Sequence, residues 1–321
     1  MTQDHGRLAG LDSLRGFAVL LVVLFHSGLL PFGWAGVDLF FGLSGFLITR
    51  ILLRSRTDAQ SFRQLAGPFY VRRALRILPL AWSAIAIAAL LTRTWKGPLL
   101  YATYVANLAW VDTRFPPAEL AHFWSLSVEE QFYFVWPLVV WTLNRRLLRW
   151  ACVAIIAIEF GARTWLSHIH APLNILVFST MVSSIPLVVG CWLATLDRLP
   201  RRAVGLLVLS SLAFVATPWL QQTIEGWRYV LAPIPIAVAI GAALVSVRGD
   251  WKPLASLGTI SYGVYVIHGL LTPWAQGAIV HPTTRAIMLL GLSIALAKIS
   301  WRILELPILR LKDRWPMPSQ S

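Results

Sequence analysis

Residues 13–31 read SLRGFAVLLVVLFHSGLLP, an apolar run with Arg15 near its start and His26 near its end. Each helical residue turns the chain by about 100° and advances it about 1.5 Å, so a separation of eleven residues returns to within roughly 20° of one face and spans roughly 16 Å. We therefore expect a membrane helix with a cation near one surface and an imidazole deep in the bilayer, both on one face. An ionisable side chain in lipid is costly and by default marks a functional site.

The composition of the whole chain supports a lipid environment. Of its 321 residues 57% are hydrophobic and 13% charged, which is too apolar for a soluble domain of this length. The net charge of +14 does not indicate a nucleic-acid partner, because the basic residues lie between apolar runs rather than in one patch. Cys152 and Cys191 both fall inside apolar runs, so we expect neither a disulfide nor a metal site.

The apolar runs predict an all-α polytopic membrane protein, since a membrane helix needs about 20 apolar residues. The first run lacks a small-residue cleavage site and is taken as a retained helix. The stretch 98–111 is apolar but short, typical of a re-entrant or interfacial segment. Ten helices are expected, at 14–31, 35–53, 74–92, 120–143, 147–167, 173–196, 202–220, 227–247, 254–274 and 284–308.

The distribution of lysine and arginine predicts the orientation. With both termini on one side, that side collects 21 of the 28 basic residues and the other side collects 6, while Lys298 lies within the last helix. Cytoplasmic segments carry the excess of basic residues, so both termini are expected in the cytoplasm, Arg15 near that face and His26 in the outer half of a plasma (inner) membrane. We expect residues 1–312 to form a single transmembrane domain and residues 313–321 a short disordered cytoplasmic tail.

Three arginines lie at the cytoplasmic entrance to the third predicted helix, in FYVRRALRILP at residues 69–79. Arg72, Arg73 and Arg76 are three or four residues apart and can share a helical face. Guanidinium groups form bidentate contacts to phosphate, so these residues together with Arg15 could bind a large anionic cosubstrate. The alternative is that they anchor the helix to anionic headgroups.

Three carboxylates fall in otherwise apolar segments. Glu129 and Glu130 lie in HFWSLSVEEQFYFVWP at 122–137, and adjacent residues diverge by about 100°, so they cannot both face one target. Asp38, in GVDLFFGLSGFLITR at 36–50, is expected near the depth of His26 and could orient its ring. Each carboxylate could instead satisfy a neighbouring cation or lie at the interface, and the glycines of 36–50 would admit a close backbone or a slim ligand.

Two further segments contain polar residues to which we assign supporting roles. GTISYGVYVIH at 258–268 places Ser261 and His268 seven residues apart and nearly aligned on a helix. His268 among aromatic neighbours, and Glu305 in ILELP, are expected to support the site rather than to react.

Taken together, these motifs resemble the membrane-bound acyltransferase-3 family from about Leu11 to about Lys312. The resemblance is carried by Arg15 and His26 with ten residues between them, GVDLFFGLSGFLI, Arg73–x–x–Arg76, FWSLSVEEQFY, and ISYGVYVIH followed by Glu305–x–Pro307. It implies transfer of an acyl group, usually acetyl from acetyl-CoA, to a carbohydrate hydroxyl at the extracytoplasmic face. It also implies that Arg15, His26, Arg73 and Arg76 are functionally essential.

The residues and the resemblance lead to one mechanism. Arg73, Arg76, Arg72 and Arg15 would hold the phosphates of acyl-CoA, and the acyl arm would reach His26, whose imidazole suits a general base. A covalent acyl-histidine is the competing version, and Glu129, Glu130 or Asp38 could orient the ring. No metal is expected.

Two other classes of function explain some of the same residues. A transporter or flippase of an anionic glycolipid or sugar would use His26 as a proton relay and the arginines as a clamp. A non-catalytic assembly partner would tolerate substitution of His26 and Arg76. We expect a stand-alone enzyme without the fused esterase-like domain of some members, acting on a cell-envelope glycan or glycolipid directly or through a separate acyl-accepting partner.

Overall fold

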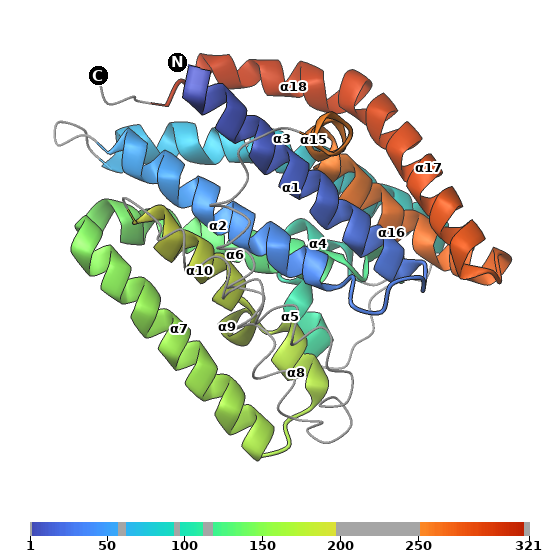
Figure 1. The fold of residues 1–321 in the computed structure, drawn as a ribbon, viewed down its shortest axis with the longest axis horizontal. Coiled ribbons are helices and arrows are strands. Elements are labelled where there is room, and N and C mark those ends of the chain that lie inside the picture. The colour runs from blue at the N-terminus through green and yellow to red at the C-terminus, as the bar shows by residue number, and fades with distance from the viewer. Residues whose placement is uncertain (1, 57–61, 93–96, 112–117, 197–250, 318–321) are drawn as a thin grey trace.

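The computed structural model describes residues 2–56, 62–92, 97–111, 118–196 and 251–317 (Figure 1). Within these ranges every regular element is a helix, which confirms the all-helical prediction. The predicted helices at 202–220 and 227–247 lie outside the described residues. In chain order the elements are α1 (Thr2–His26), α2 (Ala35–Ser55), α3 (Phe62–Thr92), α4 (Pro98–Ala102), α5 (Ala106–Val111), η1 (Ala118–Leu120), α6 (Phe123–Thr142), α7 (Arg145–His168), α8 (Leu173–Phe178), α9 (Thr180–Ser183), α10 (Ile185–Ala194), α15 (Lys252–Thr259), α16 (Ser261–Ala278), α17 (Pro282–Ser300), η2 (Trp301–Glu305), α18 (Leu306–Arg310) and η3 (Leu311–Arg314).

Several helices have the length and composition to cross a bilayer. Among the described residues three segments qualify, namely Ala35–Ser55, Gln64–Leu91 and Pro282–Arg314. The pair α15 and α16 qualifies as a fourth if it is one span bent by 71°. The apolar helices fit a membrane protein, and the number of ten spans stays a prediction.

The first helix ends five residues earlier than the predicted 14–31, at His26. Gly28 has a φ of +80°, which L side chains rarely adopt. The Leu29 N–H donates to the Leu24 carbonyl at 3.1 Å and the Gly28 N–H to the Phe25 carbonyl at 2.9 Å, the two bonds of a Schellman motif. The sequence Ser27–Gly28 therefore fixes His26 as the last residue of α1.

Two predicted helices are interrupted, contrary to the single spans expected. The segment 173–196 forms α8, α9 and α10, because Ser179 is extended (φ −71°, ψ 128°) and Pro186 lies in the first turn of α10. The segment 254–274 breaks between α15 and α16 at Ile260. The short stretch 98–111 forms two small helices, α4 and α5.

Glycines let the helices of the bundle approach closely. A Cβ on Gly190 of α10 would overlap the Gly42 carbonyl of α2, and one on Gly45 of α2 would overlap the Leu187 carbonyl of α10. The same reciprocal relation joins α1 and α15, through Gly16 and Gly258. Small residues at such crossings are typical of packing between helices in membranes. The α2 glycines thus serve backbone contact, one of the two roles considered from the sequence.

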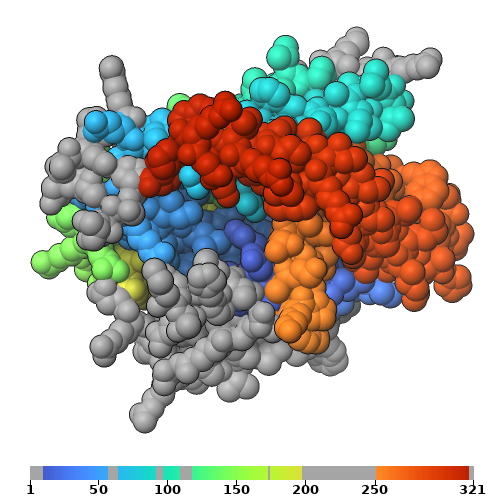
Figure 2. Space-filling view, turned by 90° about the horizontal axis from the view of Figure 1, so that it is seen from above, coloured from blue at the N-terminus to red at the C-terminus, as the bar shows by residue number. Residues whose placement is uncertain are grey.

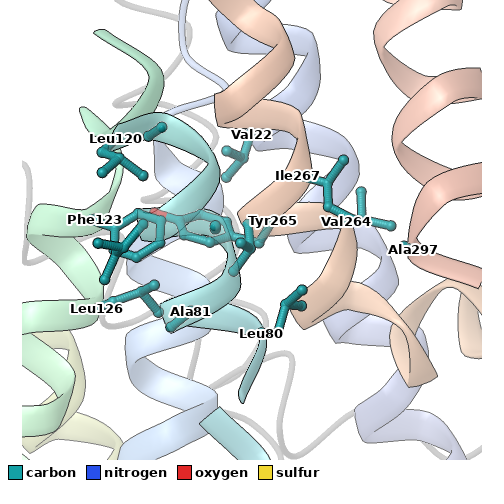
Figure 3. Close-up of a cluster of buried hydrophobic side chains, with 14 of the residues drawn as sticks. Val22, Leu80, Ala81, Leu120, Phe123, Leu126, Val264, Tyr265, Ile267 and Ala297 are labelled. Carbon is teal, nitrogen blue, oxygen red and sulfur yellow. The ribbon is translucent and has the colours of Figure 1, made fainter. Parts of the chain in front are cut away.

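The bundle places α1 between α2 and α15, with α16 and α17 beside it and α7 on the outside next to α10 (Figure 1). Phe123 and Tyr265 lie at the centre of one apolar core (Figure 3). Around them this core contains Val22 of α1, Leu80 and Ala81 of α3, Val264 and Ile267 of α16, and Ala297 of α17. This core fixes the ends of α1 and α6 against α16.

The C-terminal helical segment extends into the first residues of the predicted tail, and the disorder of 313–321 stays a prediction. After α17 the chain passes through a π-helical turn, η2, and continues through α18 and η3 to Arg314. Arg72 of α3 donates to the carbonyls of Lys312 at 3.3 Å and Trp315 at 3.2 Å. These two hydrogen bonds from Arg72 hold residues 312–315 against α3.

Candidate active site

Three histidine rings lie in a row near the C-terminal end of α1, in the order His26, His268 and His122. The ring centroids of His26 and His268 are 5.0 Å apart, and those of His268 and His122 are 5.1 Å apart. His26 ends α1, His268 lies in α16, and His122 precedes α6, so three separate helices build the series. His268 is fully buried and His122 is nearly so, whereas His26 is only partly buried. His26 is therefore the most accessible member.

The hydrogen bonds of this series decide which nitrogen atoms carry protons. His26 Nδ1 lies 2.9 Å from the Val22 carbonyl, and His268 Nδ1 lies 2.5 Å from the Tyr265 carbonyl. Because a carbonyl only accepts, both neutral rings carry their proton on Nδ1. His268 Nε2 then has a lone pair, which faces His26 Nδ1–H at 3.4 Å. This leaves a lone pair on His26 Nε2, the form that a general base requires.

The C-terminal end of α1 is held by α16 and by Arg285 of α17. Gln276 donates to the His26 carbonyl at 3.0 Å, and Arg285 donates to the Ser27 carbonyl at 3.1 Å. These bonds satisfy carbonyls that a helix end leaves without partners. They also hold His26 in place.

His122 is the residue of this series that the sequence analysis quoted but to which it gave no role. Its ring packs directly on Gly269 of α16, where an added Cβ would overlap it. Tyr265 donates to the His122 carbonyl at 3.0 Å and lies 2.5 Å from the Ser125 hydroxyl. The sequence feature that could have indicated these residues is the combination of His122 with the small and aromatic residues of 261–269.

A second group lies where α3 meets α6. Arg73 lies over the ring of Tyr133, with its guanidinium carbon 3.4 Å from the ring centroid. Its Nε is 3.6 Å from Glu130 Oε1, and the Tyr133 hydroxyl donates to Glu129 Oε1 at 3.1 Å. The two carboxylates expected near the reacting histidine are thus placed with Arg73. Tyr133, four residues after Glu129, was missed although that spacing places the two on one helical face.

A third group contains Arg15 and Asp12 near the middle of α1, Arg76 of α3 and Glu305 of η2. Arg15 pairs with Asp12 at 3.1 Å. Arg76 interacts electrostatically with the like charges of Arg15 and Arg73 and with the opposite charges of Glu305 and Asp12. Glu305 is buried and accepts from the Ser300 hydroxyl at 3.1 Å. Glu305 therefore supports the arginine group rather than the histidines.

Other predicted site residues lie apart from these groups. Asp38 interacts with Arg163 of α7, and no contact joins it to His26 within the described chain. Arg163 in turn donates to the carbonyls of Val182 and Leu176, so a buried ion cluster ties α2 to α7 and to the α8–α10 segment. Arg72 binds the C-terminal segment, as described above. Ser261 is buried at the first residue of α16.

The end of the molecule at which α1 begins is hollowed. Seen from that end, atoms of α1 and α2 lie recessed between α18, α15 and the rest of α2 (Figure 2). In the described ranges no group of three His, Cys, Asp or Glu side chains has the arrangement of a metal site.

Comparisons with known proteins identify the family of the chain. Residues 8–302 match the model of the acyltransferase domain of the acyltransferase-3 family. The peptidoglycan O-acetyltransferase OatA of Listeria monocytogenes is 28% identical over 93% of this chain and 55% of its own length. A putative peptidoglycan O-acetyltransferase of Bacillus subtilis, YrhL, is 32% identical over 96% of this chain and 56% of its own. The O-acetyltransferase OatA of Staphylococcus aureus is 28% identical over 94% and 57%.

The chain spans about half the length of the curated relatives it matches. No solved structure matches it. The family model covers most of the chain, including Arg15, His26, the Arg73–x–x–Arg76 pair and His268. This chain belongs to the acyltransferase-3 family of membrane acyltransferases.

Proposed function

We propose that this protein transfers an acetyl group from cytoplasmic acetyl-CoA to a carbohydrate hydroxyl on the extracytoplasmic side of the plasma membrane. The observation that carries the proposal is the arrangement along α1, with a cationic group beside Arg15 and a proton-accepting imidazole at His26. Because three relatives are named as O-acetyltransferases, two of them of peptidoglycan, a cell-wall glycan is the first acceptor to test.

His26 acts as general base in the proposed reaction. Its Nε2 takes the proton of the acceptor hydroxyl while the hydroxyl oxygen attacks the thioester carbonyl carbon, whose oxygen receives the electron pair. The intermediate collapses with loss of the CoA thiolate, and this thiolate takes the proton back from His26. In the acyl-histidine version Nε2 itself attacks the carbonyl carbon and the CoA thiolate leaves. The acceptor hydroxyl then attacks the acyl group, the bond from Nε2 to the acyl carbon breaks, and the hydroxyl proton ends on the CoA thiolate.

The positive charge that forms on His26 has partners already in place. Val22 O and His268 Nε2 both face His26 Nδ1–H, so they fix the ring and stabilise the imidazolium. A group that orients the base in this way is a recurring feature of hydroxyl activation. His268 is therefore a positioning residue in the proposal.

The substitution His268→Phe is expected to lower kcat about tenfold, which corresponds to about 1.4 kcal/mol of lost transition-state stabilisation. Phe keeps an aromatic ring among His26, His122 and Tyr265 but has no lone pair for His26 Nδ1–H. The measurement is the initial rate of acetyl transfer at saturating donor. A KM for acetyl-CoA that rises while kcat stays at the wild-type value would contradict this role.

The proposal places both termini in the cytoplasm and ten helices across the membrane. It is supported by the excess of basic residues on that side. The beginning of α1 and α18 also lie at the same end of the molecule (Figure 1).

The proposal is tested with the full chain in proteoliposomes, acetyl-CoA labelled in the acetyl group, and purified peptidoglycan fragments or extracted envelope glycans. We expect free CoA and labelled glycan to appear together in wild type. Free CoA without labelled glycan would support the donor half and point to another acceptor or to a separate acyl-accepting partner. Neither product, with several short acyl donors and glycans tried, would contradict the transferase and favour the transporter.

A further inference from the structure

The two arginines of Arg73–x–x–Arg76 lie one helical turn apart but have different surroundings. We propose that Arg73 is the internal counter-ion and positioning residue of Glu130, and that Arg76 with Arg15 alone receives the anionic part of the donor. The second half rests on the proposed use of acyl-CoA, and the first half does not. In this proposal Glu130 already neutralises Arg73, whereas no ion pair among the described residues neutralises Arg76.

Arg73 is occupied on two sides by residues of α6. The Tyr133 ring covers one face of its guanidinium, and Glu130 lies at its Nε edge. Glu129 also interacts with Arg73 and accepts from the Tyr133 hydroxyl. The Glu130 carboxylate, with Glu129 adding its electrostatic effect, thus neutralises Arg73, and a phosphate arriving there would meet like charges.

The Arg73–Glu130 pair is shielded from solvent. Only 20% of the Arg73 side chain and 17% of the Glu130 side chain are exposed. Removing one partner of such a pair leaves a poorly solvated charge, whereas removing both does not. The pair also joins α3 to the helix that begins just after His122, so its loss would shift α6 relative to the histidines.

Arg76 has the opposite electrostatic situation. Within the described chain its side chain makes no hydrogen bond and no ion pair. The charges that act on it are the like charges of Arg15 and Arg73 and the opposite charges of Glu305 and Asp12, and Asp12 already pairs with Arg15. A phosphate between Arg15 and Arg76 would relieve their repulsion and give Arg76 an anionic partner suited to the geometry of a guanidinium.

The test compares Arg73→Gln, Glu130→Gln, the double variant and Arg76→Gln in the full-length protein in detergent. Three quantities are measured, namely the melting temperature, its increase on adding free CoA, and the kinetic constants for acetyl-CoA. The melting temperature reports the ion pair without any need for activity. The CoA-induced increase reports the anion site without any need for an acceptor.

We expect Arg73→Gln to lower the melting temperature clearly and the double variant to recover most of that loss. The double variant should keep the CoA-induced increase and a KM for acetyl-CoA within about threefold of wild type. Its kcat should stay below wild type, because without the Arg73–Glu130 pair α6 is no longer held in its place relative to the histidines. Arg76→Gln should keep the melting temperature, lose the CoA-induced increase and raise KM at least about tenfold.

The opposite pattern would overturn the proposal. If Arg73→Gln loses the CoA-induced increase at an unchanged melting temperature, Arg73 belongs to the anion site. If Arg73→Gln and the double variant both fail to fold, the carboxylate of Glu130 is not what Arg73 neutralises. If wild type shows no increase with CoA, the assignment of Arg15 and Arg76 to CoA is wrong, while the double variant still decides the ion pair.

Discussion

Replacing His26 with Ala is expected to reduce acetyl transfer at least about 100-fold, because a positioned general base contributes about 10²–10⁴ to the rate. The imidazole is the only part of residue 26 that the proposed chemistry uses, and its Nε2 has no substitute in the described site. His268 cannot take its place, since its Nδ1 is bound to the Tyr265 carbonyl and its Nε2 faces His26. We expect the loss in kcat rather than in KM for acetyl-CoA, which depends on the arginines.

The matched control is His281→Ala. His281 is exposed, precedes α17, and makes no side-chain cap hydrogen bond, so its removal should leave transfer unchanged. The His26→Ala protein should remain folded, because the C-terminal end of α1 is still held by Gln276 and Arg285. The measurement is labelled acetyl transferred per minute per folded protein. A folded His26→Ala protein that transfers within tenfold of wild type would exclude His26 as the base.

The same variant separates the two versions of the mechanism. If His26 carries the acetyl group, wild type incubated with labelled acetyl-CoA and no acceptor should retain label after denaturation, and His26→Ala should retain none. Direct transfer predicts no retained label in either protein. Both outcomes keep His26 in the site, and the comparison chooses its role.

The sequence predicts helices well where one apolar run fills one helix. Residues 35–53 form α2, and 147–167 form most of α7. It fails where backbone geometry rather than apolarity sets a boundary. Gly28 ends α1 at His26, and Ser179 and Pro186 divide the predicted 173–196 helix, because these residues adopt or require conformations that an apolar run does not reveal.

The sequence predicts the site residues by their chemical type, but only the structure shows which of them contact one another. Spacing along one helix placed Arg15 and His26 on α1, and it related Arg73 to Arg76. It could not show that Glu130 lies against Arg73, or that Asp38 interacts electrostatically with Arg163, since these interactions join residues 57 and 125 positions apart in the sequence. The contacts of His122 with His268 and of Tyr133 with Arg73 could not be predicted for the same reason, because each joins helices that are distant in the chain.

A second large effect is expected from Gly190→Val, this time on folding. A Cβ at Gly190 would overlap the Gly42 carbonyl and lie 2.9 Å from the Phe46 nitrogen, both backbone atoms that no rotamer change can move. Overpacking a core typically costs about 1–3 kcal/mol, and a collision with backbone has fewer means of relief. We therefore expect α2 and α10 to separate and the yield of folded protein to fall severely.

The matched control for this prediction is Gly291→Val in α17, where an added Cβ meets no atom within 4 Å. Because glycine disfavours helix, this control should be neutral or slightly stabilising. The measurement is the fraction of monodisperse protein after extraction and its melting temperature in detergent. If both variants behave like wild type, the α2–α10 contact is looser than the structure shows. If both fail equally, valine in a helix of this bundle is the cause, and the close approach of Gly190 to Gly42 is not. Loss confined to Gly190→Val would establish that the backbone contact between α2 and α10 holds this part of the bundle together.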